Sequence, residues 1–208
     1  MTAFVAGMTQ LETWVAEIDT AAPWKHPRAK EWDSITCHNW MEQNLGTPFV
    51  STFFQFIVKG VGVVDPSQIS LLQFLFYSRS GKSIAHLIAT DGGAQQEVFK
   101  GGLFQVPTLM AEQLGDTVHL STRVQSIVQD DDGVTVETTK GVWRARQVII
   151  AAAPAMAQRI HFDPPLPAMR DVYMQRAPMA SVIKTYTAYD KPFWRDAGYS
   201  GQVFSEGD

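Results

Sequence analysis

The chain contains 208 residues, of which 45% are hydrophobic and 18% are charged, a balance typical of a globular protein with a substantial core. Its formal net charge of -4 and the absence of a basic run argue against a nucleic-acid surface, which requires clustered Lys and Arg. A single cysteine excludes an internal disulfide framework, and no apolar stretch reaches the ~20 residues of a bilayer crossing. We therefore expect a cytoplasmic protein with small-molecule partners.

Helical patterns occupy the first ninety residues. An apolar stripe at spacings of three and four predicts a first helix that ends near Asp19. A second helix is expected to begin with Asp33 or Ser34 as its N-cap. A third should cover Val50–Lys59, and a fourth should open with Asp65 as its N-cap, followed at once by a proline. The apolar faces of these helices are expected to pack together.

Strand patterns dominate the middle of the chain. An amphipathic helix over Val106–Leu114 is followed by a short strand at Val118–Leu120. Alternating residues at Arg123–Gln129 and Gly133–Thr138 flank the turn sequence DDDG, which is typical of a hairpin. The continuous apolar run Gln147–Ala153 predicts a strand buried on both faces, as in an α/β sheet covered by helices.

The last part of the chain returns to an extended pattern. Alternation over Ser181–Tyr189 predicts another long strand. Helices followed by strands and then a further strand indicate an α/β chain in which one domain is interrupted by part of another. The histidines have no ligand-like spacing, so we expect no metal site; they are His26, His38, His86, His119 and His161.

Four ordered segments resemble the flavin-dependent monoamine oxidase family (flavin amine oxidase), and in detail its bacterial members. They are GGAQQEVFKGG, RVQSIVQDDDGVTVET, ARQVIIAAAPAMAQRIHFDPPLPAMR and PMASVIKTYTAYDKPFWR. The resemblance implies an α+β substrate domain plus part of a Rossmann-like FAD-binding domain. It assigns residues 1–99 to the helical part of the substrate domain, 100–173 to the FAD-binding domain and 174–208 to the sheet part of the substrate domain.

The same resemblance implies an enzyme that uses FAD and O2 to deaminate amines to aldehydes, with H2O2 and ammonia as products. The G-x-G-x-x-G turn that holds a dinucleotide pyrophosphate is missing from the sequence. We therefore expect an internal fragment that is inactive alone, with any membrane anchor outside it. A non-catalytic, partner-binding remnant and a polyamine oxidase-like flavoprotein are the alternatives.

Lys184 is the sharpest catalytic candidate. A lysine within an alternating strand either points to solvent or needs a buried partner, and the pattern alone favours an exposed face. The resemblance instead implies a lysine that holds a water beside the flavin N5. On the substrate side it points to Gln95, with the adjacent Gln96 left open, and to Leu87 and Phe204 as residues of the entrance cavity.

Two further residues match positions on the cofactor side of the family. Val124 falls at a strand where main-chain groups hold the adenine part of FAD, so its side chain is core in either interpretation. Ala151 matches a small residue that lets the chain approach the cofactor. Both assignments come from the resemblance alone.

Overall fold

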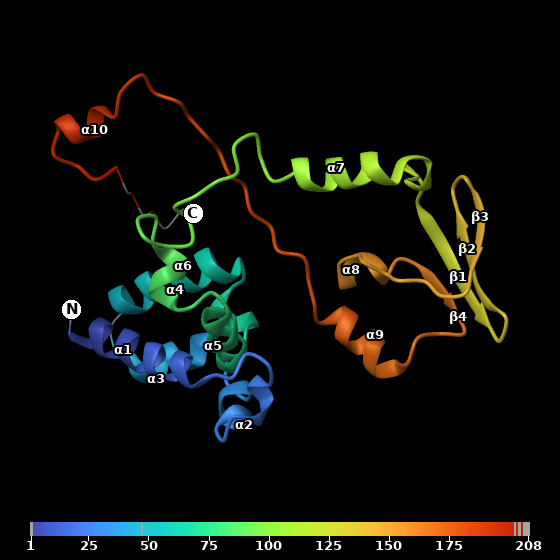
Figure 1. Ribbon diagram of the computed structural model, residues 1–208. Helices are drawn as coiled ribbons and strands as arrows, with labels where there is room; N and C mark the ends of the chain where they lie inside the picture. Colours follow the sequence, from blue (N-terminus) through green and yellow to red (C-terminus); the bar gives the residue numbers. More distant parts are fainter. Residues whose placement is uncertain (1, 47, 202, 204, 206–208) are drawn as a thin grey trace.

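The computed structural model describes residues 2–46, 48–201, 203 and 205. The first ninety residues form a helical body, and a small sheet with neighbouring helices lies apart from it (Figure 1). Residues 89–104 connect the two parts, and residues 176–192 lead away from the sheet part to a short helix near the end of the chain (Figure 1). The helical body consists of α1 (Thr2–Glu17), η1 (Pro23–Lys25), α2 (Ala29–Asp33), α3 (Cys37–Asn44), α4 (Pro48–Gly62), η2 (Pro66–Gln68), α5 (Leu71–Ser80) and α6 (Ile84–Ile88).

Two N-cap residues pair with each other in the helical body. The Thr36 hydroxyl accepts the N–H of Asn39 at 3.1 Å to begin α3, and the Ser70 hydroxyl accepts the N–H of Gln73 at 3.2 Å to begin α5. Thr36 and Ser70 also form an antiparallel backbone bridge. Because an N-cap residue has extended backbone, both can join this bridge without interrupting their helices.

This bridge accounts for two departures from the predicted helices. The second helix was expected to begin at Asp33 or Ser34, which is wrong: α2 ends at Asp33, and α3 begins only after Thr36. Asp65 does act as a cap and accepts a backbone N–H at 3.0 Å, but it opens the short η2, while α5 begins after Ser70. The first helix is confirmed and the third extends further than predicted at both ends.

The interior of the helical body is one apolar core. Its rings are in direct contact, with centroid distances of 5.6 Å between Trp40 and Phe54 and 6.1 Å between Phe54 and Phe74. Burial of this area is the main stabilising contribution to the body. The buried members are Leu11, Val15, Ile18, Trp32, Cys37, Trp40, Met41, Leu45, Phe54, Ile57, Val58, Leu71, Phe74, Leu75 and Ile84.

The sheet has the strand order β3-β2-β1-β4. β1 (Val124–Asp130) and β2 (Gly133–Thr138) form the predicted antiparallel hairpin, which is confirmed. β3 (Gly141–Ala145) continues it antiparallel to β2, and β4 (His161–Asp163) lies parallel to β1. The sequence patterns missed β3 and β4, whose short lengths show no clear alternation. α8 (Pro154–Ala157) and α9 (Ala168–Gln175) lie beside the sheet (Figure 1).

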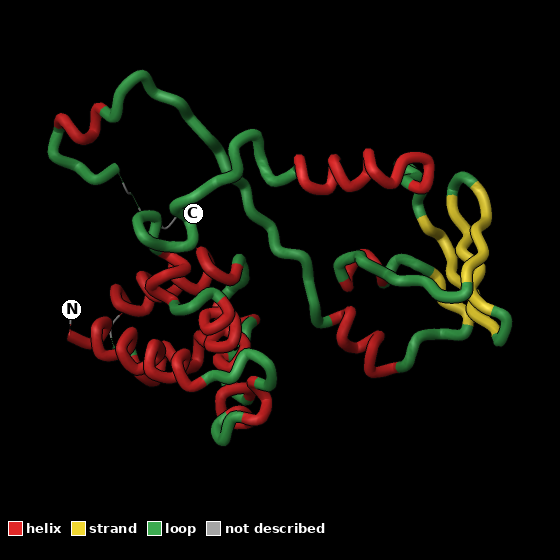
Figure 2. The backbone as a smooth tube through the Cα atoms, viewed as in Figure 1, coloured by secondary structure: helices red, strands yellow, loops and turns green. Residues whose placement is uncertain are grey.

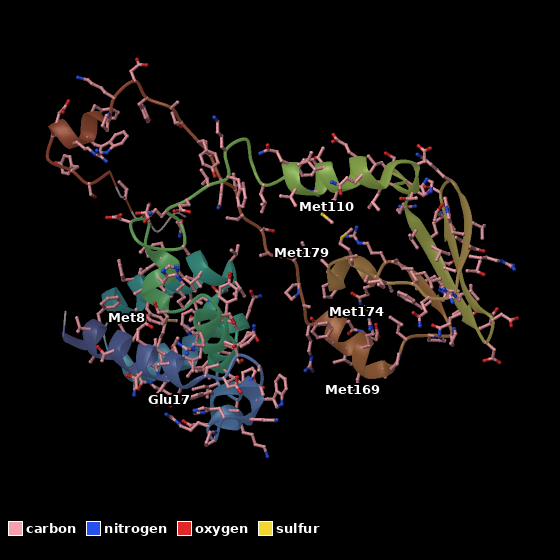
Figure 3. The ribbon with its side chains drawn as sticks, viewed as in Figure 1. Met8, Glu17, Met110, Met169, Met174 and Met179 are labelled. Carbon is pink, nitrogen blue, oxygen red and sulfur yellow. The ribbon has the colours of Figure 1, made fainter. Side chains whose placement is uncertain are left out.

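α7 (Gln105–Leu114) and η3 (Gly115–Thr117) lead into the sheet, and α10 (Phe193–Asp196) lies near the end of the chain. The helix predicted over Val106–Leu114 is confirmed. Its apolar side chains are exposed, with Leu109 at 57% and Met110 at 58%; Figure 3 labels Met110 on this helix. None of the residues of α7 is buried.

Three predicted strands are absent. Val118–Leu120, Gln147–Ala153 and Ser181–Tyr189 carry no strand and appear as loop in Figure 2. Ile149, expected to be buried, is 91% exposed, and Ile183 is 93% exposed. A strand buried on both faces needs neighbouring strands and covering helices, and the elements of the described chain place none against these segments.

The fold class is confirmed as a mixture of helices and a mixed sheet. Among the residues that the structure describes, no helix is both long and apolar enough to cross a membrane.

Candidate functional site

Two of the predicted substrate-side residues lie together. The Gln95 Nε2 donates to the backbone carbonyl of Leu87 at 3.2 Å, so the loop after α6 folds back onto the helix. Leu87 is half-buried and Gln95 is exposed. The bond joins the Gln95 amide to the Leu87 backbone, while the Leu87 side chain lies against Gly81.

The position of α6 is determined by contacts with the helical body. Ser83 caps the helix by accepting the N–H of His86 at 3.0 Å, and Ile84 is fully buried in the core. The Glu12 carboxylate on α1 accepts the N–H of Ala85 at 2.8 Å. A carboxylate at a helix N-terminus satisfies a free N–H group and interacts favourably with the helix dipole.

The glycines near α6 allow close approaches. A Cβ on Gly81 would collide with the Leu87 side chain, and a Cβ on Gly93 would collide with the carbonyl oxygen of Ala89. Gly81 therefore lets Leu87 lie against the end of α5, and Gly93 lets the loop lie against the end of α6. Substitution at Gly93 requires a backbone shift, because the atom in the way is itself backbone.

Gln96, the alternative left open beside Gln95, has a different surrounding. Its Oε1 accepts the N–H of Gly92 at 2.5 Å, so its carbonyl group is used within the loop. Gln95 uses its Nε2 and keeps its carbonyl oxygen available to a ligand.

The catalytic candidate Lys184 lies in the exposed segment between α9 and α10. Residues just before it line a cavity of about 920 Å³ shared with the helical body, including Ala180 and Val182 on one side and Lys59 and Asp65 on the other. Lys59 Nζ and Asp65 Oδ2 are 3.5 Å apart. Lys184 itself is outside this wall.

The cofactor-side candidates are separate from each other. Val124 begins β1, is half-buried and pairs with Thr138, next to a register irregularity. Ala151 lies exposed in the loop before α8. Phe204 lies outside the described residues. The structure thus brings Gln95 and Leu87 together and leaves Lys184, Val124 and Ala151 on three different segments.

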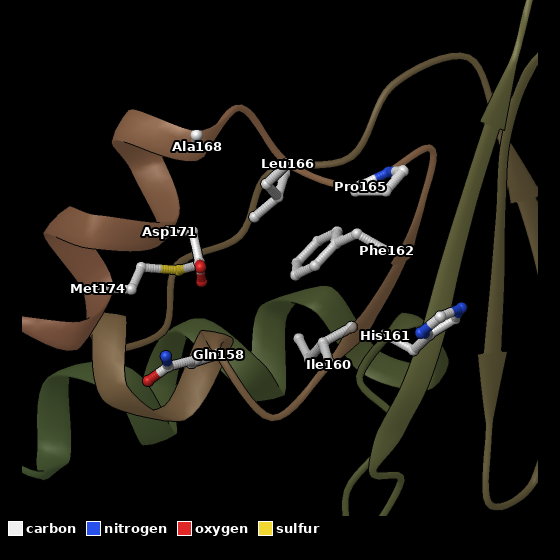
Figure 4. A pocket seen from close by; sticks show the side chains of 9 residues that line it. All are labelled: Gln158, Ile160, His161, Phe162, Pro165, Leu166, Ala168, Asp171 and Met174. Carbon is white, nitrogen blue, oxygen red and sulfur yellow. The ribbon is translucent and has the colours of Figure 1, made fainter.

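A cavity of about 460 Å³ lies between α8, β4 and α9 (Figure 4). Its wall is apolar at Phe162, Leu166 and Met174 and polar at His161 and Asp171. The Asp171 carboxylate accepts from Gln175 Nε2 at 2.9 Å. None of the predicted site residues lines it, so it gives no support to their assigned roles.

A cluster of charged and aromatic side chains lies near the end of α1. The Arg28 guanidinium lies 4.5 Å from the ring centre of Trp14 and 4.8 Å from that of Trp32. Its Nε donates to the Glu31 carboxylate at 2.8 Å, and this hydrogen bond lowers the pKa of Glu31. Cation–π contacts of this kind hold α2 against α1.

The only cysteine, Cys37, is not a reactive thiol. The Cys37 thiol is fully buried, and burial raises its pKa to about 12, which removes it as a nucleophile. Over the described ranges, no three His, Cys, Asp or Glu side chains gather as metal ligands. The sequence patterns did not predict the roles of Glu12 and Gly93. Glu12 and its partner Ala85 are 73 positions apart in the sequence, so no local pattern connects them. The adjacent glycines Gly92 and Gly93, in contrast, could have indicated a tight turn.

The sequence matches the family model described as flavin containing amine oxidoreductase over residues 2–208. It is similar to a probable flavin-containing monoamine oxidase A from Dictyostelium discoideum, with 34% identity over 96% of this chain and 44% of that protein. The chain therefore spans less than half the length of this relative.

Solved structures give the same result. Cyclohexylamine oxidase from Brevibacterium oxydans superimposes with a TM-score of 0.76 at 30% identity, over 83% of this chain and 38% of that one. Wild-type putrescine oxidase bound to putrescine superimposes with a TM-score of 0.78 at 26% identity, over 96% of this chain and 45% of that one.

Proposed function

Because this chain belongs to the family of flavin-containing amine oxidoreductases, we propose that the whole protein to which it contributes is an FAD-dependent amine oxidase. The overall reaction converts R–CH2–NH2, O2 and H2O into R–CHO, NH3 and H2O2. The amine carbon loses two electrons and O2 gains them, and water supplies the aldehyde oxygen. The redox chemistry belongs to the cofactor.

The observation that carries this proposal is the family match over residues 2–208. The superposition on cyclohexylamine oxidase supports it, since the identity of 30% extends over 83% of this chain. The hydrogen bond from Gln95 to the Leu87 backbone carbonyl adds a local feature: it orients an exposed amide, a group that suits the nitrogen of an amine.

The proposed roles follow the resemblance. Gln95 and Leu87 contact the amine, Lys184 lies beside the cofactor, and Val124 and Ala151 approach the cofactor with their backbone. Phe204 is proposed for the entrance cavity. The division into residues 1–99, 100–173 and 174–208 is part of the same proposal.

The described residues do not by themselves fit around FAD. Lys184, Val124 and Ala151 lie on three separate segments, and Lys184 and Ala151 are exposed. None of the cavities described above has any of the three in its wall. The cofactor assignment therefore rests on family membership, and no catalytic step is derived from this geometry.

The test is to purify the whole protein, record its visible flavin spectrum and add amines without oxygen. Bleaching of the flavin by an amine, followed by peroxide formation on admission of air, is the expected result. Cyclohexylamine and putrescine as parallel substrates separate a monoamine oxidase from a polyamine oxidase-like enzyme. A flavin that no amine bleaches would refute the proposal.

The non-catalytic alternative is tested on the 208-residue chain. The exposed apolar face of α7, including Leu109 and Met110, favours a partner-binding surface in this chain taken alone. Titration with FAD and equilibrium dialysis should then detect no bound flavin. Stoichiometric binding together with amine-dependent bleaching would show that these residues suffice for activity.

A further inference from the structure

We infer that Gln96 is a positioning residue, which holds the loop after α6 so that the Gln95 carbonyl oxygen accepts an N–H of the amine. The inference rests on the proposed amine oxidase function and deepens it. The two adjacent glutamines then have different roles, and Glu12 anchors α6, the helix that precedes their loop.

The loop after α6 is hydrogen-bonded to the end of that helix. The His86 carbonyl accepts the N–H of Ala94 at 2.9 Å, and the Ala89 carbonyl accepts the N–H of Gln95 at 3.4 Å. The Leu87 carbonyl accepts from the Gln95 side chain at 3.2 Å. The last carbonyls of a helix lack intrahelical partners. Here the loop supplies the hydrogen-bond donors for these carbonyls, so the loop and the helix form one unit.

The Gln96 side chain forms a hydrogen bond within this loop. Its Oε1 accepts the N–H of Gly92 at 2.5 Å, and Gly92 has a φ of +67°, a conformation that favours glycine. The next residue, Gly93, packs closely on the Ala89 carbonyl. The side chain of Gln96 therefore fixes the turn that carries Gln95.

The Gln95 amide has a carbonyl oxygen that can accept a hydrogen bond from a ligand. Its Nε2 donates to Leu87, which orients the planar amide and sets its oxygen as the available group. A carbonyl oxygen has two lone pairs and donates nothing. It therefore suits an N–H donor such as an amine.

The N-terminal end of α6 is anchored to the helical body. Glu12 on α1 accepts the N–H of Ala85 at 2.8 Å, and Ile84 is fully buried. The helical core thus holds α6 at its N-terminal end while Gln96 holds the loop at its C-terminal end. Loss of either contact should loosen Gln95 without removing any group that touches the amine.

The experiment compares Gln96→Ala with Gln96→Glu. Glutamate keeps an oxygen acceptor for Gly92 but lacks the NH2 group, so it separates a positioning role from direct contact through that group. In the whole protein, Gln96→Ala should raise the KM for amine about three- to tenfold with kcat nearly unchanged, as expected for one lost hydrogen bond. Gln96→Glu should restore KM to within about twofold.

A second readout uses NMR of the 208-residue chain. The amide proton of Gly92 should lie downfield and exchange slowly in the wild type and in Gln96→Glu, and should lose both properties in Gln96→Ala. Glu12→Gln, which keeps an acceptor for Ala85, and Glu12→Ala form a matched pair for the anchor. Only the alanine variant should change the KM.

Two results would overturn the inference: a Gln96→Glu variant as impaired as Gln96→Ala, or a Gly92 amide that is identical in all three proteins. The proposed function fails separately, if the wild-type whole protein shows no amine-dependent flavin bleaching. In that case the Gly92 amide still decides whether Gln96 holds the loop.

Discussion

Replacement of Phe54 by alanine should strongly destabilise the helical body. Phe54 is 1% exposed and its ring contacts those of Trp40 and Phe74 at 5.6 and 6.1 Å. Truncation of a buried phenylalanine costs about 3–5 kcal/mol, and each lost ring contact adds about 0.5–1.5 kcal/mol. We expect a loss near the upper end, about 5 kcal/mol, which is comparable to the whole stability of many domains.

The assay is urea unfolding of the 208-residue chain followed by tryptophan fluorescence, because Trp14, Trp32 and Trp40 lie in or against the same core. Phe54→Leu keeps part of the volume but loses both ring contacts, so it should cost about 1–3 kcal/mol, less than Phe54→Ala. Tyr186→Ala, at a side chain that is 88% exposed, should stay within about 0.5 kcal/mol. A loss below about 1 kcal/mol for Phe54→Ala, or equal losses at both positions, would refute the assignment of the core.

Three further outcomes are expected. Cys37, whose burial raises its pKa to about 12, should resist iodoacetamide in the folded chain and react after unfolding, as mass spectrometry can show; alkylation at the rate of a free thiol would contradict its burial. The hydrogen bond from Arg28 lowers the pKa of Glu31, so its stabilisation is present above the ordinary value of about 4 and is lost as the pH falls through the lowered value. Wild-type stability should therefore fall more than that of Glu31→Gln below pH ~4, and parallel curves would exclude the linkage. Lys184→Met in the whole protein should reduce amine-dependent peroxide production more than about tenfold, while in the 208-residue chain, where the side chain is exposed, it should leave the unfolding midpoint unchanged; unchanged turnover would remove the lysine from the proposed site.

Local patterns were sufficient where one element determines itself. The stripe that includes Leu11 and Ile18 predicted α1, and both residues are buried in the core. Alternation on either side of DDDG predicted the β1–β2 hairpin, which needs no distant partner. The order of the family segments, including those around Gln95 and Lys184, also sufficed to indicate the family over the whole chain.

Patterns were insufficient where a segment depends on its neighbours. Gln147–Ala153 is apolar enough for a buried strand, yet it pairs with nothing in the described chain and Ile149 is exposed. An alternation of period two shows which face of a segment is apolar. The backbone hydrogen bonds that make the segment a strand, however, come from a neighbouring strand. The same dependence explains why the strand predicted over Ser181–Tyr189 is absent.

The sequence by itself determined α1, α4, α7, the hairpin and the family, because periodicity and ordered motifs are local properties of the chain. Only the tertiary structure decided that Thr36 and Ser70 pair and so divide the predicted helices. It also decided that the Glu12 carboxylate accepts the N–H of Ala85, 73 positions away, and that Gln96 accepts the N–H of Gly92 through its Oε1 while Gln95 donates through its Nε2. These features depend on backbone groups brought together by packing, which no local spacing records.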